Sequence, residues 1–153
     1  MNSCLLLGSN LGDRNALLAQ AQAQIEQNCG HLIKVSKIYE TAPWGFKADT
    51  PFLNQALLIN TTLPPEELIT RCLEIETLMG RMRIPDKQPY SSRTIDIDIL
   101  FYEETVCQSP HLTLPHPLLP ARLFALQPMA EVAPEWVHPV LGLTADEMIR
   151  RLP

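Results

Sequence analysis

The stretch Arg93–Tyr102 reads RTIDIDILFY, and its alternation decides the fold class. Three isoleucines alternate with Asp96 and Asp98, as expected of a strand with one buried face. Aspartate is among the poorest strand formers, and two such carboxylates lie ~6.6 Å apart along a strand. Their charges repel by roughly 2 kcal/mol at an effective dielectric near 20. We therefore expect a central strand whose acidic face is kept for a reason other than stability.

Asp96 and Asp98 supply the hard oxygen ligands that Mg²⁺ prefers, together with substrate phosphates. Two catalytic metal ions typically lie ~3.5–4 Å apart, a span that neighbouring carboxylates can bracket. A solvated strand face is the ordinary interpretation of an isolated pair of this kind. The isoleucine-rich context makes that interpretation less attractive, so the pair indicates a magnesium site.

The segment before this strand, residues 81–93, is basic and contains two prolines, which predicts a long mobile loop. It holds four of the 12 lysines and arginines of a chain with net charge −5: Arg81, Arg83, Lys87 and Arg93. Guanidinium groups bind phosphate oxygens bidentately. A basic loop beside an acidic pair thus indicates a polyphosphate substrate, with a solvated charged loop as the alternative.

The rest of the chain predicts a strand–helix–strand–strand–helix–strand order. Besides the acidic strand, the strands fall within residues 3–9, 31–40 and 52–63, and the helices within 15–28 and 64–79. Asp13 has the position of a helix N-cap, and Gly30 and Gly80 follow the two helices. This order is that of an α+β ferredoxin-like sandwich, with helices on a mostly antiparallel sheet, long mobile loops and a single domain over residues 1–153.

Three further regions carry weaker patterns. The second helix has an apolar stripe of Leu68, Cys72, Ile75 and Leu78 or Met79. In residues 112–139, prolines alternate with short apolar pieces, which predicts short helices and turns without a regular element. Thr144 and Glu147 have capping-box spacing and predict a terminal helix.

Composition narrows the class of protein. Of the 153 residues, 46% are hydrophobic and 19% are charged, which is typical of a globular chain. The negative net charge excludes broad electrostatic attraction to nucleic acid or to anionic membranes. The four cysteines have no metal-ligand spacing, so we expect free, mostly buried thiols in a reducing compartment. The apolar run Cys4–Leu7 is too short for a signal peptide or a membrane span. We expect a cytoplasmic monomer.

Other polar and aromatic residues are candidates for a binding site. Gly8 opens a GSN turn that matches neither a Walker A loop nor GxGxxG. Asn54 interrupts an apolar strand, and with Trp44, Phe52 and Phe124 it could hold a flat heterocycle by amide hydrogen bonds and stacking. Packing in the core is the alternative for these aromatic residues.

Seven motifs, in order, give the chain a specific resemblance: LLLGSNLGDR, YETAPWG, PFLNQAL, EIETLMGRMR, RTIDIDIL, LTLPHP and RLFALQPMAEVAP. The chain resembles the 6-hydroxymethyl-7,8-dihydropterin pyrophosphokinase family of the folate pathway nearly from end to end. The resemblance implies transfer of the β,γ-pyrophosphoryl group of ATP to the pterin hydroxymethyl oxygen, with release of AMP and with two Mg²⁺ ions at the acidic pair.

Carried over by position, the resemblance also implies residue roles. Asp96 and Asp98 would bind the metal ions, and Arg81 and Arg93 would stabilise the charge that develops during transfer. The nucleotide side would comprise Glu76, Arg83, Arg93, Ile99, Thr113, His116 and Arg122. The pterin side would comprise Gly8, Thr41, Ala42, Pro43, Trp44, Phe52, Asn54 and Phe124.

The chain departs from the family pattern mainly on the nucleotide side. The family commonly has a sequence such as RWGPR before the acidic strand, where this chain has KQPYSSR, with Ser92 in place of proline. His111 stands where an arginine often precedes the LT of LTLPHP. On the pterin side, Phe52 lacks the hydroxyl of the tyrosine sometimes found there.

Two other functions fit parts of the sequence. A polymerase-like nucleotidyltransferase also pairs a G-S turn with two strand aspartates, but there the two lie close in sequence, whereas Ser9 and Asp96 are far apart. A module that binds pterin or nucleotide without turnover would explain the altered loop, yet both aspartates and Arg81, Arg83 and Arg93 remain. The released product distinguishes all three.

Overall fold

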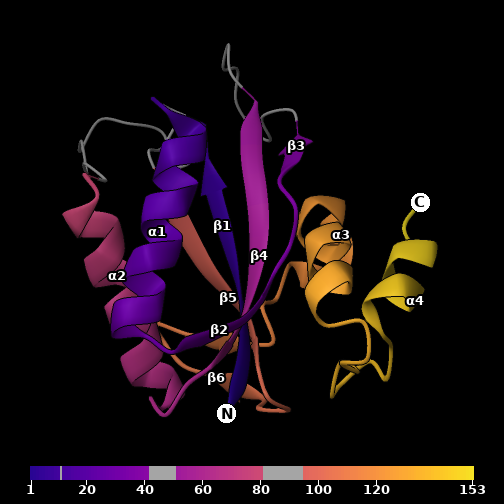
Figure 1. Cartoon of the computed structure of the whole chain (residues 1–153). Helices are drawn as coiled ribbons and strands as arrows, with labels where there is room; N and C mark the ends of the chain where they lie inside the picture. The colour runs from indigo at the N-terminus through magenta and orange to yellow at the C-terminus, as the bar shows by residue number, and fades with distance from the viewer. Residues whose placement is uncertain (11, 42–50, 81–94) are drawn as a thin grey trace.

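A five-stranded antiparallel sheet forms the centre of the molecule (Figure 1). The computed structural model describes residues 1–10, 12–41, 51–80 and 95–153. Residues 11, 42–50 and 81–94, which include most of the segment predicted to be a mobile loop, lie outside the described residues. The elements are β1 (Asn2–Ser9), α1 (Arg14–Asn28), β2 (His31–Val35), β3 (Tyr39–Thr41), β4 (Phe52–Asn60), α2 (Pro65–Leu78), β5 (Asp96–Tyr102), β6 (Cys107–Gln108), β7 (Thr113–Leu114), the 3₁₀ helix η1 (Leu119–Ala121), α3 (Leu123–Val132) and α4 (Ala145–Arg150).

The strand order confirms the ferredoxin-like prediction. The sheet runs β2-β4-β1-β5, with β3 also paired to β4, and every pairing is antiparallel. Because α1 joins β1 to β2 around β4, and α2 joins β4 to β5 around β1, each helix spans a split strand pair. The two βαβ units therefore interleave, as this fold requires.

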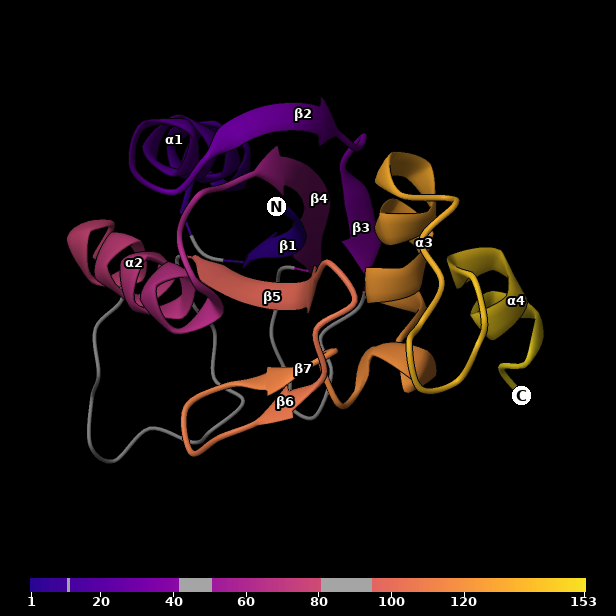
Figure 2. The ribbon, with the colours of Figure 1, turned by 90° about the horizontal axis from the view of Figure 1, so that it is seen from below.

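Helices cover both faces of the sheet (Figure 2). Against α1 and α2 packs a cluster that includes Leu5, Leu7, Leu18, Ile25, Leu57, Ile59, Leu68, Ile75, Ile97 and Ile99. Against α3 and α4 packs a second cluster that includes Cys4, Leu6, Ala56, Leu100, Phe101, Leu126, Met129 and Met148. Successive residues of β1 thus enter opposite cores, which is the burial expected of a central strand.

β5 is an edge strand, so the prediction that it is central was wrong. It lies at the end of the strand order and pairs in the sheet with β1. A bulge explains its central appearance, because Leu5 pairs with Ile99 and Cys4 with Phe101, leaving Leu100 as an extra residue. The bulge places Leu100 and Phe101 together in the core beneath α3. Burial on both faces therefore gave β5 the apolar pattern of a central strand.

Residues 31–40 form two strands rather than the single predicted one. β2 ends at Val35 and β3 begins at Tyr39. Between them, the buried Ser36 accepts a hydrogen bond from the Ala56 N–H through Oγ and donates Oγ–H to the Lys37 carbonyl, at 2.9 and 2.7 Å. A side chain thus takes the ladder position of a backbone group, and the strand is interrupted.

The C-terminal third contains a regular helix that the sequence did not predict. α3 spans ten residues, with Pro128 inside it, and buries Ala125, Leu126, Met129 and Val132. These residues have helical spacing, but the surrounding prolines obscured it. The terminal helix α4 confirms the predicted capping box, since Thr144 and Glu147 each accept a backbone N–H of the other.

Three smaller predictions have mixed outcomes. Asp13 caps α1 as expected, because its carboxylate accepts the Ala16 N–H. In the apolar stripe of α2, Met79 is buried but Leu78 is 70% exposed. The four cysteines are free, and Cys107 is the half-buried one. In the part of the chain that the structure describes, no helix has the length and apolar character needed to span a membrane.

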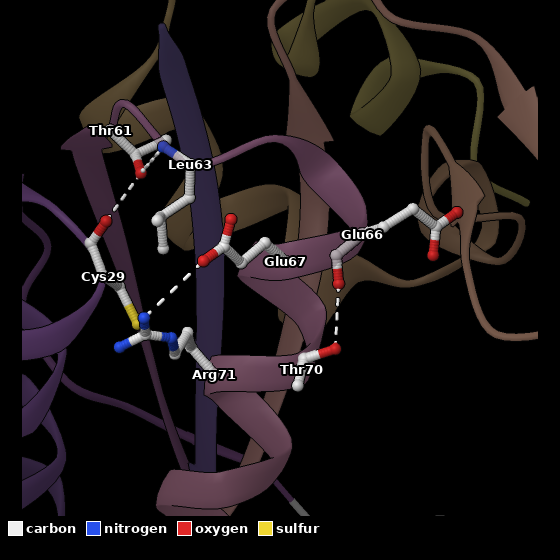
Figure 3. A network of polar contacts seen from close by, with 7 residues as sticks. All are labelled: Cys29, Thr61, Leu63, Glu66, Glu67, Thr70 and Arg71. Atoms are coloured by element: carbon white, nitrogen blue, oxygen red, sulfur yellow. Dashed lines mark hydrogen bonds and ion pairs between the residues drawn. The ribbon is translucent and has the colours of Figure 1, made fainter.

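The two glycines after the helices act differently. Gly80 has a φ of +90°, the left-handed conformation predicted for it, whereas Gly30 is not among the positive-φ glycines of the described residues. A Cβ on Gly30 would lie 2.5 Å from the Asn60 carbonyl oxygen. The same junction is held by Thr61, whose Oγ donates to the Cys29 carbonyl at 2.6 Å and accepts the Leu63 N–H at 3.1 Å (Figure 3). Gly30 thus permits close approach of the α1 end to β4.

We expect Gly30→Ala to lower the free energy of unfolding by about 1–3 kcal/mol, because a methyl group must displace backbone in a packed junction. Urea denaturation monitored by circular dichroism measures the change. Gly8→Ala is the matched control, since its Cβ meets neighbours only at 3.4 Å or more. An unchanged unfolding midpoint for Gly30→Ala would contradict the steric explanation.

Candidate active site

Asp96 and Asp98 lie half-buried on the face of β5 opposite Ile97 and Ile99. Their alternation therefore points them away from α1 and α2, as predicted. Asp96 pairs across the sheet with Gly8, and Asp98 pairs with Leu6. The acidic face is thus continuous with the face of β1 that carries Leu6 and Gly8.

One row of residues crosses the sheet at this point. Asp96 is opposite Gly8, Gly8 is opposite Asn54, and Asn54 is opposite Tyr39, so that four strands contribute. Directly paired residues point to the same face. A Cβ on Gly8 would lie 3.4 Å from Asn54 Oδ1 and 3.8 Å from the Phe52 ring. Gly8 therefore leaves bare backbone between a carboxylate and a carboxamide, with an aromatic edge beside it.

Thr41 orients the Asn54 carboxamide. Asn54 Nδ2 donates to Thr41 Oγ1 at 2.9 Å, and the Asn54 side chain is buried. Because the amide nitrogen is engaged there, Oδ1 faces the Gly8 position. The arrangement offers a hydrogen-bond acceptor in the plane of a flat ligand lying over Gly8.

His116 lies close to Asp96. Its backbone N–H donates to the Leu100 carbonyl at 2.9 Å, and its ring Nδ1 accepts the Leu118 N–H at 3.2 Å. Burial, and then the Arg122 guanidinium, lower the pKa of His116 below the ordinary 6.5, while Asp96 acts in the opposite direction. With Nδ1 accepting, the ring proton resides on Nε2, which makes Nε2–H a donor.

The remaining predicted residues of this part come from the C-terminal third. The Arg122 guanidinium lies 5.4 Å from the centre of the Phe124 ring, so cation and ring form one unit at the start of α3. Thr113 is in β7, which pairs with β6 and contacts β5 (Figure 2). Of these residues, Arg122 lies near the His116 ring, as Asp96 does.

Two residues predicted to bind the nucleotide have side chains that are buried away from the acidic face of β5. The Ile99 side chain is buried in the core beneath α1 and α2, so only its backbone is available at the strand edge. Glu76, on α2, is buried, and its Oε2 accepts the Ile97 N–H at 2.7 Å. Neither side chain therefore lies on the acidic face itself.

Six predicted site residues lie outside the described residues: Ala42, Pro43, Trp44, Arg81, Arg83 and Arg93. Two residues that the sequence did not single out hold neighbouring segments. Arg14 Nη1 donates to the Pro51 carbonyl at 2.9 Å, and Tyr39 Oη donates to Glu131 Oε1 at 2.9 Å. Arg14 and Tyr39 belong to two of the seven motifs, but no spacing indicated their partners, because both bonds join residues far apart in the chain.

The donor set of this face fits a hard cation shared with a phosphate. Asp96 and Asp98 provide carboxylate oxygens, and the bare Gly8 leaves beside them a space that a Cβ would fill. Within the described ranges, no group of three or more histidines, cysteines, aspartates or glutamates is arranged to hold a metal ion. The pair alone does not saturate a cation, which is typical of sites that share the metal with substrate.

Comparison with known proteins identifies the family. Residues 4–134 match the family model described as 7,8-dihydro-6-hydroxymethylpterin-pyrophosphokinase. The chain belongs to this family. This match confirms the resemblance inferred from the seven motifs. It also confirms the predicted activity, which is transfer of pyrophosphate from ATP to 6-hydroxymethyl-7,8-dihydropterin in folate biosynthesis.

Individual relatives agree with the family assignment. The 2-amino-4-hydroxy-6-hydroxymethyldihydropteridine pyrophosphokinase of Porphyromonas gingivalis is 42% identical over 136 residues, which cover 88% of this chain and 92% of that protein. The enzyme of the same name from Bacillus subtilis is 41% identical over 129 residues, which cover 84% of this chain and 75% of that protein. These pyrophosphokinases match nearly the whole described fold.

A solved structure supports the fold alone. The wild-type HPPK-DHPS of Plasmodium falciparum, crystallised with pteroate, superposes with a TM-score of 0.76 at 18% identity. The match covers 98% of this chain and 42% of that one. The present chain therefore spans less than half of that protein, and the shared part has the ferredoxin-like architecture of the pyrophosphokinase domain.

Proposed function

We propose that the pyrophosphokinase reaction takes place on the face defined by Asp96, Gly8 and Asn54. The register that aligns these three residues carries the proposal, because it places a cation-binding carboxylate and an amide acceptor on either side of bare backbone. The pterin ring lies over Gly8 with its polar edge toward Asn54 Oδ1. The triphosphate lies toward Asp96 and Asp98.

In this arrangement the pterin hydroxymethyl oxygen attacks the β-phosphorus of ATP. The new oxygen–phosphorus bond forms as the bond from the β-phosphorus to the α,β-bridging oxygen breaks, AMP leaves with that oxygen, and the hydroxyl proton is lost. Asp96 and Asp98 would hold two Mg²⁺ ions, and the strand keeps both carboxylates on one face. The ions would supply neutralisation of the phosphate charge during transfer.

The other residues bind and orient. Thr41 fixes the Asn54 amide, and Phe52 and Phe124 contact the ring. On the nucleotide side, His116 Nε2–H and Arg122 donate to phosphate or ribose oxygens, with Thr113 and the Ile99 backbone beside them. The same proposal assigns the pterin to Ala42, Pro43 and Trp44, the nucleotide to Arg83, and the developing charge to Arg81 and Arg93.

We also propose that residues 1–153 act as one pyrophosphokinase domain, as a monomer in the cytoplasm. Size-exclusion chromatography with light scattering tests the oligomeric state. A mass near twice the 17.2 kDa of the chain would contradict the monomer.

The decisive experiment follows the products of ATP and 6-hydroxymethyl-7,8-dihydropterin. We expect stoichiometric AMP and pterin diphosphate with Mg²⁺, and neither product when EDTA removes the metal. Chromatography with phosphorus NMR separates the alternatives. Release of pyrophosphate with AMP left on the pterin would indicate a nucleotidyltransferase, and binding without AMP at saturating substrates would indicate a module without turnover.

A further inference from the structure

Glu76 is a buried acid bonded to the backbone between the two aspartates. Glu76 is 2% exposed, and its Oε2 accepts the N–H of Ile97 at 2.7 Å. Ile97 stands between Asp96 and Asp98, so the bond fixes one of the two peptide N–H groups between the acidic pair. The donor and the acceptor come from β5 and α2, which are 21 residues apart in sequence at this point.

The bond lies on the outer edge of the sheet. Among the described residues β5 pairs with a strand of the main sheet on one side only, β1, and Glu76 approaches from α2 on the other. An edge strand that no second strand pairs is free to twist or shift. At this edge Glu76 accepts the N–H of Ile97, as a neighbouring strand would. Further along β5, the backbone N–H of His116 donates to the Leu100 carbonyl. On this outer edge the backbone that carries the aspartates is therefore fixed by side-chain and loop contacts, while the ladder with β1 holds its other edge.

Other glutamates of the described residues also accept backbone N–H groups, but none of them is buried. Glu26 accepts from Leu32, Glu103 from Asn2, Glu131 from Lys37 and Glu147 from Thr144, and each of these acids is exposed or half-exposed. Glu76 in addition occupies the last turn of α2, where the helix dipole disfavours an anion. Glu76 therefore makes this bond at a higher desolvation cost than the exposed glutamates do, and it makes it next to the acidic pair.

We infer that Glu76 is a positioning residue for the acidic pair, in place of the direct nucleotide contact that the family resemblance implied. Its hydrogen bond holds Ile97, and with it the spacing and direction at which Asp96 and Asp98 share a divalent cation. The inference rests on the proposed metal role of that pair. Removing a residue that hydrogen-bonds to a metal ligand and orients it typically lowers metal affinity or activity 10- to 100-fold.

Three substitutions separate the bond from the charge. Glu76→Met removes the acceptor at similar length, Glu76→Asp keeps the charge but shortens the reach, and Glu76→Gln keeps an acceptor oxygen without the charge. We expect Met and Asp to expose the Ile97 amide to hydrogen exchange and to weaken Mn²⁺ binding by about 10- to 100-fold in the presence of a non-hydrolysable ATP analogue. Glu76→Gln should retain most of the Ile97 amide protection and most of the Mn²⁺ affinity. Affinity for the analogue without metal should be unchanged in all three.

The readouts are amide exchange by nitrogen-15 NMR and Mn²⁺ affinity by water-proton relaxation, neither of which needs turnover. Glu26→Met and Glu26→Asp are the matched controls, because Glu26 makes the same kind of bond to Leu32 at the opposite edge of the sheet. They should leave Mn²⁺ affinity unchanged. If Glu76→Met does not fold, Glu76→Asp decides the question, since it retains a polar, charged side chain at this position.

Two outcomes would overturn the inference. Wild-type Mn²⁺ affinity in Glu76→Asp would show that the bond to Ile97 does not position the pair, and weakened metal-free binding of the analogue would favour a direct nucleotide contact. Asp96→Asn and Asp98→Asn, measured in parallel, test the underlying site. If the Asp96→Asn and Asp98→Asn variants also bind Mn²⁺ normally, the metal role of the pair itself is wrong. If these two variants lose Mn²⁺ affinity and the Glu76 variants keep it, the pair binds the metal but Glu76 does not position it.

Discussion

Asp96→Ala is expected to lower turnover by at least about 10³-fold, with Asp98→Ala close behind. Catalytic metal ions contribute several kcal/mol to transition-state stabilisation, and each 1.36 kcal/mol is a tenfold change in rate. The fold should survive, because both carboxylates are half-exposed and removing one relieves their mutual repulsion. The loss should therefore appear in activity and not in stability.

AMP formation at saturating ATP, pterin and Mg²⁺ measures this loss, with thermal unfolding in parallel. Asp146→Ala is the matched control, since Asp146 is an exposed acid in the first turn of α4, outside the predicted site. It should keep wild-type turnover. Near-normal AMP formation by Asp96→Ala would exclude the metal role of that residue.

Gly8→Ala is expected to raise KM for the pterin by roughly 10²-fold, because displacing a reacting ligand by about 1 Å costs that much. The new methyl group would stand between Asp96 and Asn54, in the space that the ring is proposed to occupy. It would meet protein atoms only at 3.4 and 3.8 Å, which are ordinary contacts. The folded chain thus has room for the methyl group when the ligand is absent, but not when it is bound.

Steady-state kinetics and urea denaturation together test this prediction. Gly8→Ala should keep its unfolding midpoint while losing pterin affinity, whereas Gly30→Ala should lose stability and keep pterin KM. The same substitution at two glycines then has opposite effects on stability and on pterin KM. Unchanged pterin KM in Gly8→Ala would move the ring away from this row of residues.

The local patterns of the sequence predicted much of the fold and part of the site. Alternation correctly placed Asp96 and Asp98 on the face opposite the isoleucines, since side-chain direction in a strand depends only on the backbone pleat. The caps at Asp13 and Thr144 were predictable for a similar reason, because capping bonds span three residues. The family resemblance assigned Gly8 and Asn54 to the same site but did not indicate that they are paired across neighbouring strands.

What the sequence by itself determined, then, is which residues face which side and the order of the elements, because both follow from short-range periodicity. Only the tertiary structure decided that β5 is an edge strand, that Gly8 lies between Asp96 and Asn54, and that Glu76 bonds to Ile97. Each of these depends on register between strands or on packing between α2 and β5. Such contacts join residues 21 to 88 positions apart, as in Glu76 with Ile97 and Gly8 with Asp96, over which no periodicity in the chain extends.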